Sequence, residues 1–469
     1  MIIMRKAHYI LSLALFSAVS PLKAQTLNEA LEMAYKSNPT LQGERANQRA
    51  VTENSAQARS GWRPTVTINV DANYQKGPYT GAYALGSYTS NYAEGYVQAR
   101  QTLYSFGHVA NQVKAADARS RAEIHALEQT ENQVFTSAIT AYMDVLRDRA
   151  ILDVRKADLE MLRRQVQLTT SRYNLGGIPA EQVTKTDVEQ AQARLHSAEV
   201  GLNQARATLA SSEALFRTVI GVEPGVLVMP EGLPGLPNDL GHALKEALAS
   251  SPQFAQSQDN KSAADADIDT ARSQWGPQIQ AQGMFGTTGP ASPFRGRLYG
   301  EQMSGTVSLV QPLYNGDLYN SQIRQARDKD EQARHAVELA RRTVLQNVAA
   351  SWSAVENGLQ AISAGAAEVH SGETTLKGYQ LEYGYGLRST TDVLYADQNL
   401  RSAQVELASS GHDTIVAEAN LLASMGRLQA QQLLSNNHDT HGEEAFRHAR
   451  RRGWEPLQAP ISALDQAGW

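Results

Sequence analysis

The sequence contains an internal repeat. The stretch LNEALEMAYKSNPTL, residues 27–41, returns 213 positions later as LGHALKEALASSPQF, residues 240–254. The same shift carries ARSGWRP onto ARSQWGP. An ordered series of such matches indicates a duplicated architecture. We therefore expect two structural units of one design in tandem, spanning residues 25–225 and 226–430.

Each unit is predicted to contain a pair of strands. In TVTINVDANY apolar and polar residues alternate, and a period of two is typical of a strand. The predicted strands lie at 65–74, 92–104, 278–286 and 303–313. Their length of roughly ten residues suits a tilted strand in an outer membrane. Trp62 and Trp275 precede the strands, and either the membrane interface or a packed core would suit them.

Long helices are predicted after the strands. No proline occurs from 107 to 173 or from 316 to 383, and a helix of that length is roughly 100 Å long. Apolar residues recur every seven positions there, and every three or four along the return helices at 187–220 and 392–425, which is typical of coiled coils. An ordinary amphipathic helix would drift off a seven-residue repeat over this distance. Each unit should therefore end in a helical hairpin.

The ends of the chain lie outside the repeat. Residues 1–24 place Arg5 and Lys6 before an apolar run, which is typical of a secretory signal peptide, although a buried N-terminal helix is the alternative. The chain has no cysteine, so disulfides and a lipid on an N-terminal cysteine are excluded. Residues 431–469 are polar and are expected to be a disordered tail. Scattered histidines and the lack of a phosphate-binding glycine loop predict no metal site, no cofactor and no enzyme.

One chain supplies too few strands to close a barrel. The smallest closed barrels in membranes have about eight strands, because an open edge cannot face lipid. Two copies would give eight strands and three copies twelve, so the chain must oligomerise. The long polar helices suit the staves of a tube better than a compact globule. The net charge of -5 argues against a nucleic-acid partner.

The order of these parts resembles the TolC family of outer-membrane efflux channels. The motifs that carry the resemblance are RSxWxP before the strands, RYNLGG followed by TDV in the first unit, and EYGYGLRSTTDVL in the second. The resemblance covers about residues 25–430. It implies a mainly α chain with a membrane β-barrel: a homotrimer whose twelve-stranded outer-membrane barrel continues into a long α-helical barrel across the periplasm.

The resemblance also implies a function and partners. Family members are passive exit ducts of tripartite efflux pumps or type I secretion systems. They work with a periplasmic adaptor and an inner-membrane transporter, which is proton-driven or of the ABC type. Without an N-terminal cysteine, the chain is more similar to the unlipidated TolC branch. The competing hypothesis is a trimeric coiled-coil adhesin or spacer of the cell envelope, which would not explain the strand pairs.

The bend of the second hairpin is the candidate gate. By resemblance it lies at the periplasmic end of the tube, where Tyr383 and Arg388 contact Thr186 and Asp187 of neighbouring helices. By the same resemblance, Asp392 forms an acidic ring in the pore. The residues alone support a simpler interpretation for both acids, because an acid at a helix start is often an N-cap.

Glycines mark both bends and are expected to act as helix C-caps. They are Gly176, Gly177, Gly384 and Gly386. The sequence departs from the family in two places. Tyr395 stands where the best-known member has a second acid, so the acidic ring should be single. The first bend, around 177–181, is about five residues longer than the second, which affects how Asp187 and an adaptor would dock.

Overall fold

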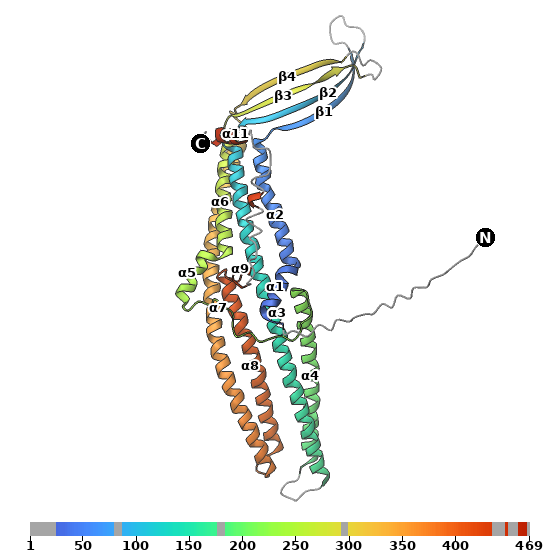
Figure 1. Ribbon diagram of the computed structural model, residues 1–469, viewed down its shortest axis with the longest axis vertical. Coiled ribbons are helices and arrows are strands. Elements are labelled where there is room, and N and C mark those ends of the chain that lie inside the picture. The colour runs from blue at the N-terminus through green and yellow to red at the C-terminus, as the bar shows by residue number, and fades with distance from the viewer. Residues whose placement is uncertain are drawn as a thin grey trace, which may run out of the picture.

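The molecule is elongated, with a β-sheet at one end and two helical hairpin tips at the other (Figure 1). The computed structural model describes residues 25–78, 87–175, 183–291, 299–433, 446–448 and 458–466. The predicted signal peptide lies outside these residues. None of the helices in these ranges is both long enough and apolar enough to cross a membrane.

The four strands form one antiparallel sheet in the order β1-β2-β3-β4. They are β1 (Thr65–Pro78), β2 (Ser87–Tyr104), β3 (Gln278–Gly289) and β4 (Gly300–Val310). The sheet joins the two repeats, because β2 of the first pairs with β3 of the second. Both faces of β1 are exposed in the single chain, and Val66, Ile68 and Val70, which share one face, are 64%, 76% and 79% exposed. One apolar face is therefore presented outward.

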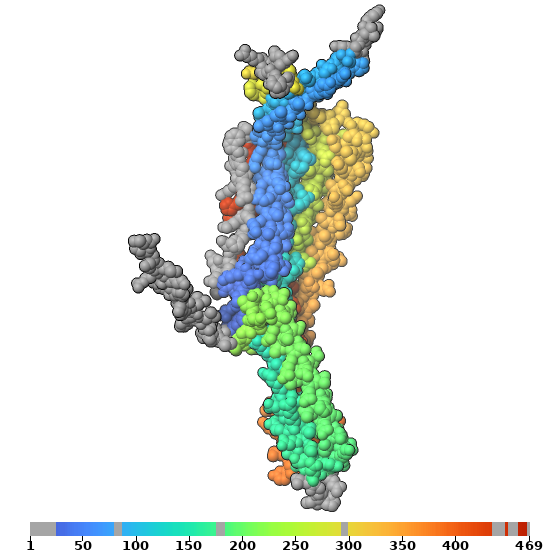
Figure 2. All heavy atoms as spheres, turned by 90° about the vertical axis from the view of Figure 1, so that its right-hand side faces the viewer, coloured from blue at the N-terminus to red at the C-terminus, as the bar shows by residue number. Residues whose placement is uncertain are grey.

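The long helices form a layer around α3. They are α2 (Pro39–Arg59), α3 (His108–Leu175), α4 (Lys185–Ile220), α6 (Pro252–Ser273), α7 (Leu318–Gly384) and α8 (Thr390–Ser424). Toward the sheet, α3 packs against α2 and α6, and α7 packs against α6. Toward the tips, α3 packs against α4 and α8, and α7 packs against α8. Figure 2 shows the α3–α4 hairpin in front of the α7–α8 hairpin at the lower end.

The largest core lies where α1 (Leu27–Ser37) and the ends of α4 and α8 meet the middle of α3. Phe135, Tyr142 and Phe216 are fully buried there. The Tyr142 hydroxyl lies 2.8 Å from the Gln25 carbonyl oxygen and accepts a 2.9 Å hydrogen bond from the Val228 amide. The start of the described chain and the linker between the repeats are thereby fixed to α3. In the second repeat, α5 (Leu240–Ser250) packs on α7.

Several predicted boundaries need correction. β1 continues to Pro78 instead of ending at 74, β2 begins at Ser87 instead of 92, and β3 continues to Gly289 instead of 286. The predicted strand at 303–313 lies at 300–310, because Pro312 has no N–H to pair in a sheet. The long helices occupy 108–175 and 318–384, and the return helices 185–220 and 390–424. Each return helix begins two residues early because its N-cap precedes the predicted acid.

The expectation of a disordered tail over 431–469 is wrong for part of it. The first residues continue α9 (Ala430–Leu433), and α11 (Gln458–Gln466) packs against β2, α3 and the short helix η1 (Ser60–Trp62) at the base of the sheet. Trp62 is 4% exposed and belongs to this small core, which settles its two interpretations in favour of the core. Its counterpart Trp275 is half-buried and packs edge-on against Tyr319, with ring centroids 5.4 Å apart.

Candidate functional site at the hairpin tips

The second tip turns within a few residues. The long helix α7 ends at Gly384, and the chain reverses through Gly386, which has φ of 75°. The amide of Leu387 donates to the Glu382 carbonyl oxygen at 2.9 Å, as in a Schellman C-cap. Gly386 therefore has the predicted C-cap role, whereas Gly384 has no positive φ and continues the helix. Gly176 and Gly177 of the first tip lie outside the described residues.

Both return helices begin with a capping box. The Ser389 amide donates to Asp392 Oδ2 at 3.0 Å, and the Asp392 amide donates to Ser389 Oγ at 3.2 Å. The same pair of bonds joins Thr184 and Asp187, at 2.8 Å and 3.3 Å. Each acid therefore satisfies backbone donors at a helix start. Within one chain, Asp187 therefore caps the start of its helix, as expected for an acid at that position.

The pKa of Asp392 is lowered below its ordinary value. The backbone N–H of Ser389 is the largest cause, followed by the Ser389 hydroxyl and the positive charge of Arg388. Hydrogen bonds to the ionised form favour that form. Asp392 is thus an anion at neutral pH.

Arg388 is held within its own tip. Its Nε lies 2.7 Å from Glu382 Oε2, and its guanidinium lies 4.2 Å from the centroid of the Tyr379 ring. The ion pair is half-exposed, so water screens it in the single chain. Arg388 is therefore ordered without Asp187. Glu382 and Tyr379 are partners that the sequence interpretation missed.

Tyr383 connects the two tips. Its hydroxyl accepts a 3.2 Å hydrogen bond from Thr390 Oγ1, and its ring lies 4.5 Å from the guanidinium carbon of Arg172 on α3. A second contact of the same kind places Arg194 of α4 4.9 Å from the ring of Tyr395. Cation–π contacts of this type are worth about 0.5–1 kcal/mol at exposed sites. Thr186 is exposed on α4.

A buried acidic pair lies further from the tips, between α3 and α8. Asp397 is 2% exposed and hydrogen-bonded to Asp158, and its Oδ1 lies 3.1 Å from Arg401 Nη2. Burial raises the pKa of Asp397 to about 6 and also raises that of Asp158, while Arg401 opposes both shifts. The pair borders a cavity of about 330 Å³ that Arg155 and Arg194 also line. The sequence signal was an aspartate four residues before an arginine on an apolar seam.

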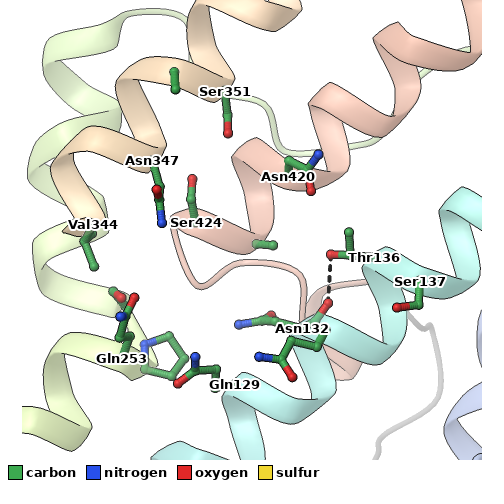
Figure 3. Close-up of a pocket in the computed structure, with 15 residues that line it drawn as sticks. Gln129, Asn132, Thr136, Ser137, Gln253, Val344, Asn347, Ser351, Asn420 and Ser424 are labelled. Carbon is green, nitrogen blue, oxygen red and sulfur yellow. Dashed lines mark hydrogen bonds between the residues drawn. The ribbon is translucent and has the colours of Figure 1, made fainter. Parts of the chain in front are cut away.

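A larger pocket of about 490 Å³ opens where α8 ends and α6 begins, between α3 and α7. Figure 3 shows that neutral amides and hydroxyls surround it, among them Asn132, Asn347 and Asn420. The described residues that line it include no charged side chain. Acid–base chemistry is therefore unsupported in this pocket. No group of three or more histidine, aspartate or glutamate side chains in the described ranges could hold a metal ion.

Comparisons with known proteins agree with this architecture. The sequence model of the family described as "Outer membrane efflux protein" matches residues 30–222 and 243–427, which are the two repeats. The outer membrane efflux protein BepC of Brucella suis is 29% identical over 439 residues, covering 93% of each chain. The outer membrane protein TolC of Escherichia coli is 28% identical over 444 residues, covering 91% of this chain and 87% of TolC.

Solved structures share the fold at lower identity. The CmeC outer membrane channel of Campylobacter jejuni has a TM-score of 0.75 and 14% identity, covering 91% of this chain and 89% of CmeC. The outer membrane protein VceC of Vibrio cholerae has a TM-score of 0.72 and 18% identity, covering 85% of this chain and 96% of VceC. These likenesses confirm the fold class predicted from the duplication and the strand pairs.

Proposed function

The chain belongs to the outer membrane efflux protein family and is an outer-membrane channel for efflux or secretion, and we propose that it works as a trimer gated at its hairpin tips. The observation that carries the trimer is the outer edge of β1 and of β4, because neither edge pairs with another strand among the described residues. Such edges are stable in a membrane only when the sheet closes.

Closure by copies of the same chain follows from the strand directions. The strands alternate along the sheet, so β1 and β4 run antiparallel and β4 of one copy can pair with β1 of the next. Three copies give twelve strands, within the range known for outer-membrane barrels. The exposed Val66, Ile68 and Val70 then face lipid. The helices of three copies continue the barrel as a tube.

The gate is proposed from the contacts at the tips. At the tips, the α7–α8 hairpin contacts the α3–α4 hairpin through Arg172 on Tyr383 and Arg194 on Tyr395. Each contact is weak on its own, but threefold symmetry repeats it. A docking partner can therefore release the tips for a few kcal/mol. In the closed trimer, Arg388 and Tyr383 are proposed to reach Asp187 and Thr186 of a neighbouring chain.

The partners proposed are a periplasmic adaptor and an inner-membrane transporter. The transporter supplies the energy, which a passive duct lacks. The TtgC and ArpC proteins of Pseudomonas putida are named as outer membrane proteins of efflux pumps, and AprF of Pseudomonas aeruginosa as an alkaline protease secretion protein. Both drug efflux and type I secretion are thus represented among the relatives.

Two measurements on the purified protein test the proposal. In mild detergent its mass should be three times that of one chain, and a monomer or dimer would overturn the twelve-stranded barrel. In planar lipid bilayers it should give discrete conductance steps. A correctly inserted trimer without conductance would favour the structural spacer of the cell envelope.

A further inference from the structure

The helix α11 fills a small core at the junction between sheet and helices. Ile461 is 7% exposed and packs with Trp62, Val109 and Val113. Gln458 accepts a 3.1 Å hydrogen bond from Arg63 Nε. The residues that receive α11 belong to the first repeat, hundreds of positions earlier in the chain. The contact therefore joins the two ends of the described chain.

Asp465 is the polar centre of this contact. Its Oδ1 accepts hydrogen bonds from the Ser105 amide at 2.8 Å, the Ser105 hydroxyl at 2.9 Å and the Gly107 amide at 3.2 Å. Its Oδ2 accepts a 3.2 Å bond from Trp62 Nε1. The side chain is 1% exposed. A carboxylate buried this deeply is stable only when donors surround it, and here four do so.

The turn that Asp465 holds is strained. It lies between β2 and α3, and Phe106 at its centre has φ of 53°, which is uncommon for a bulky side chain. The two amides bonded to Asp465 stand on either side of Phe106. The Phe106 ring lies over Gly276, where an added Cβ would be 2.0 Å from the ring. The surroundings must therefore fix this turn, and Asp465 supplies two of the bonds that do so.

The corresponding turn of the second repeat is held by other contacts, which come from within that repeat. The two junctions are equivalent, because Gln101 bonds the Trp62 carbonyl and Gln311 bonds the Trp275 carbonyl in the same way. Yet the place of Gly107 is taken by an acid, Asp317, which pairs with Arg324 at 2.9 Å. The place of Val109 is taken by Tyr319, which packs on Trp275. Asp317 is half-exposed and binds the side chains of Asn320 and Arg324, whereas Asp465 is buried and binds the amides of its turn.

We propose that α11 is a clasp that completes the first junction, with Ile461 and Asp465 supplying the apolar contact and the acid that this repeat lacks. The surface around Trp62 is a docking site with one occupant, residues 458–466 of the same chain. Asp465 is a positioning residue: it fixes the turn through which a membrane strand passes into the longest helix. The role is independent of which substrate the channel carries.

Hydrogen–deuterium exchange of the full-length protein in detergent tests the clasp. In Asp465→Ala, the peptide containing the Ser105 and Gly107 amides should exchange about ten-fold faster, since the loss of buried hydrogen bonds of this kind costs on the order of 1–3 kcal/mol. The peptide containing Asn315 and Asp317 reports the second junction and should be unchanged. Equal exchange at the first junction in wild type and Asp465→Ala would overturn the proposal.

Matched variants separate the clasp from a general loss of folding. Asp153→Asn, whose side chain is 74% exposed, should leave the exchange rate at both junctions unchanged. If Asp465→Ala does not fold, Trp62→Phe removes a single donor to the carboxylate. The exchange rate at the first junction should then rise by a smaller factor. An unchanged exchange rate would again contradict the clasp.

Discussion

The two hairpin tips begin their return helices alike but arrange their charges differently. Thr184 with Asp187 and Ser389 with Asp392 form the same capping box. Before the bend, however, the first repeat has Arg172 where the second has Glu382. Glu382 binds Arg388 in its own tip, whereas Arg172 leaves its hairpin and lies over Tyr383 of the other.

The difference shows how a duplicated hairpin can acquire two roles. The helix starts are conserved in structure because every helix must satisfy its first amide groups. The residues around them are free to change, and here one tip binds itself while the other binds its neighbour. In the proposed closed state, the tips are held by these side chains and not by the apolar residues that pack the helices together.

The largest effect is expected when the second tip loses three contacts that Arg388 and Tyr383 make. Arg388→Ser with Tyr383→Phe removes the ion pair to Glu382, the cation–π contact to Tyr379 and the hydrogen bond from Thr390. Trimer yield should be little changed, because the heptad seams carry the packing. Single-channel conductance in lipid bilayers should rise several-fold. An unchanged conductance in an inserted trimer would place the gate elsewhere, with the first bend as the next region to test.

Single variants then decide which partner of Arg388 matters. Glu382→Gln raises conductance if Arg388 closes the tip through the pair seen within the chain. Asp187→Asn raises it if Arg388 changes partner to a neighbouring chain in the closed trimer. The comparison of these two variants therefore separates an internal lock from a lock between chains.

A smaller and pH-dependent effect is expected at the seam between the hairpins. Because the pKa of Asp397 is raised to about 6 in the folded state, the packed hairpins bind a proton more tightly than the unfolded chain. The contribution of this proton to the free energy of unfolding is fully present below about pH 4, and it is lost as the pH rises through about 6. Asp397→Asn should flatten this dependence, as measured by thermal unfolding between about pH 4 and 8.

The control for the seam is Asp153→Asn, because Asp153 lies on α3 like Asp158 but is exposed. It should unfold with the pH dependence of the wild type. If Asp397→Asn keeps the full dependence as well, groups other than the Asp158–Asp397 pair govern it.

The smallest effect is expected for ion selectivity. Because the pKa of Asp392 is lowered, its carboxylate keeps its negative charge down to a lower pH than an ordinary aspartate does. Repeated three times, it should favour cations. Asp392→Asn should shift the reversal potential in a salt gradient toward zero, whereas Asp187→Asn, the matched cap of the first tip, should shift it less. Equal shifts would mean that Asp392 acts only as a cap.

Periodicity and repetition were enough to predict the strands, the long helices and the bends. Those features depend on local pattern, which a single sequence displays. The partners of Arg388 and Tyr383 were harder, because Glu382 and Arg172 come close to them only after two hairpins pack. α11 could not be predicted, since it has only nine residues and their docking depends on an acid meeting a turn 360 residues away.

That separation along the chain sets an order of events. A chain is made and exported from its N-terminus, so the turn at Ser105 leaves the ribosome long before Asp465 exists. During that interval the first junction lacks its acid and its apolar cover. A chain interrupted anywhere in the second repeat never receives them. Without residues 458–466, Ser105, Gly107 and Trp62 would lose the carboxylate to which they donate.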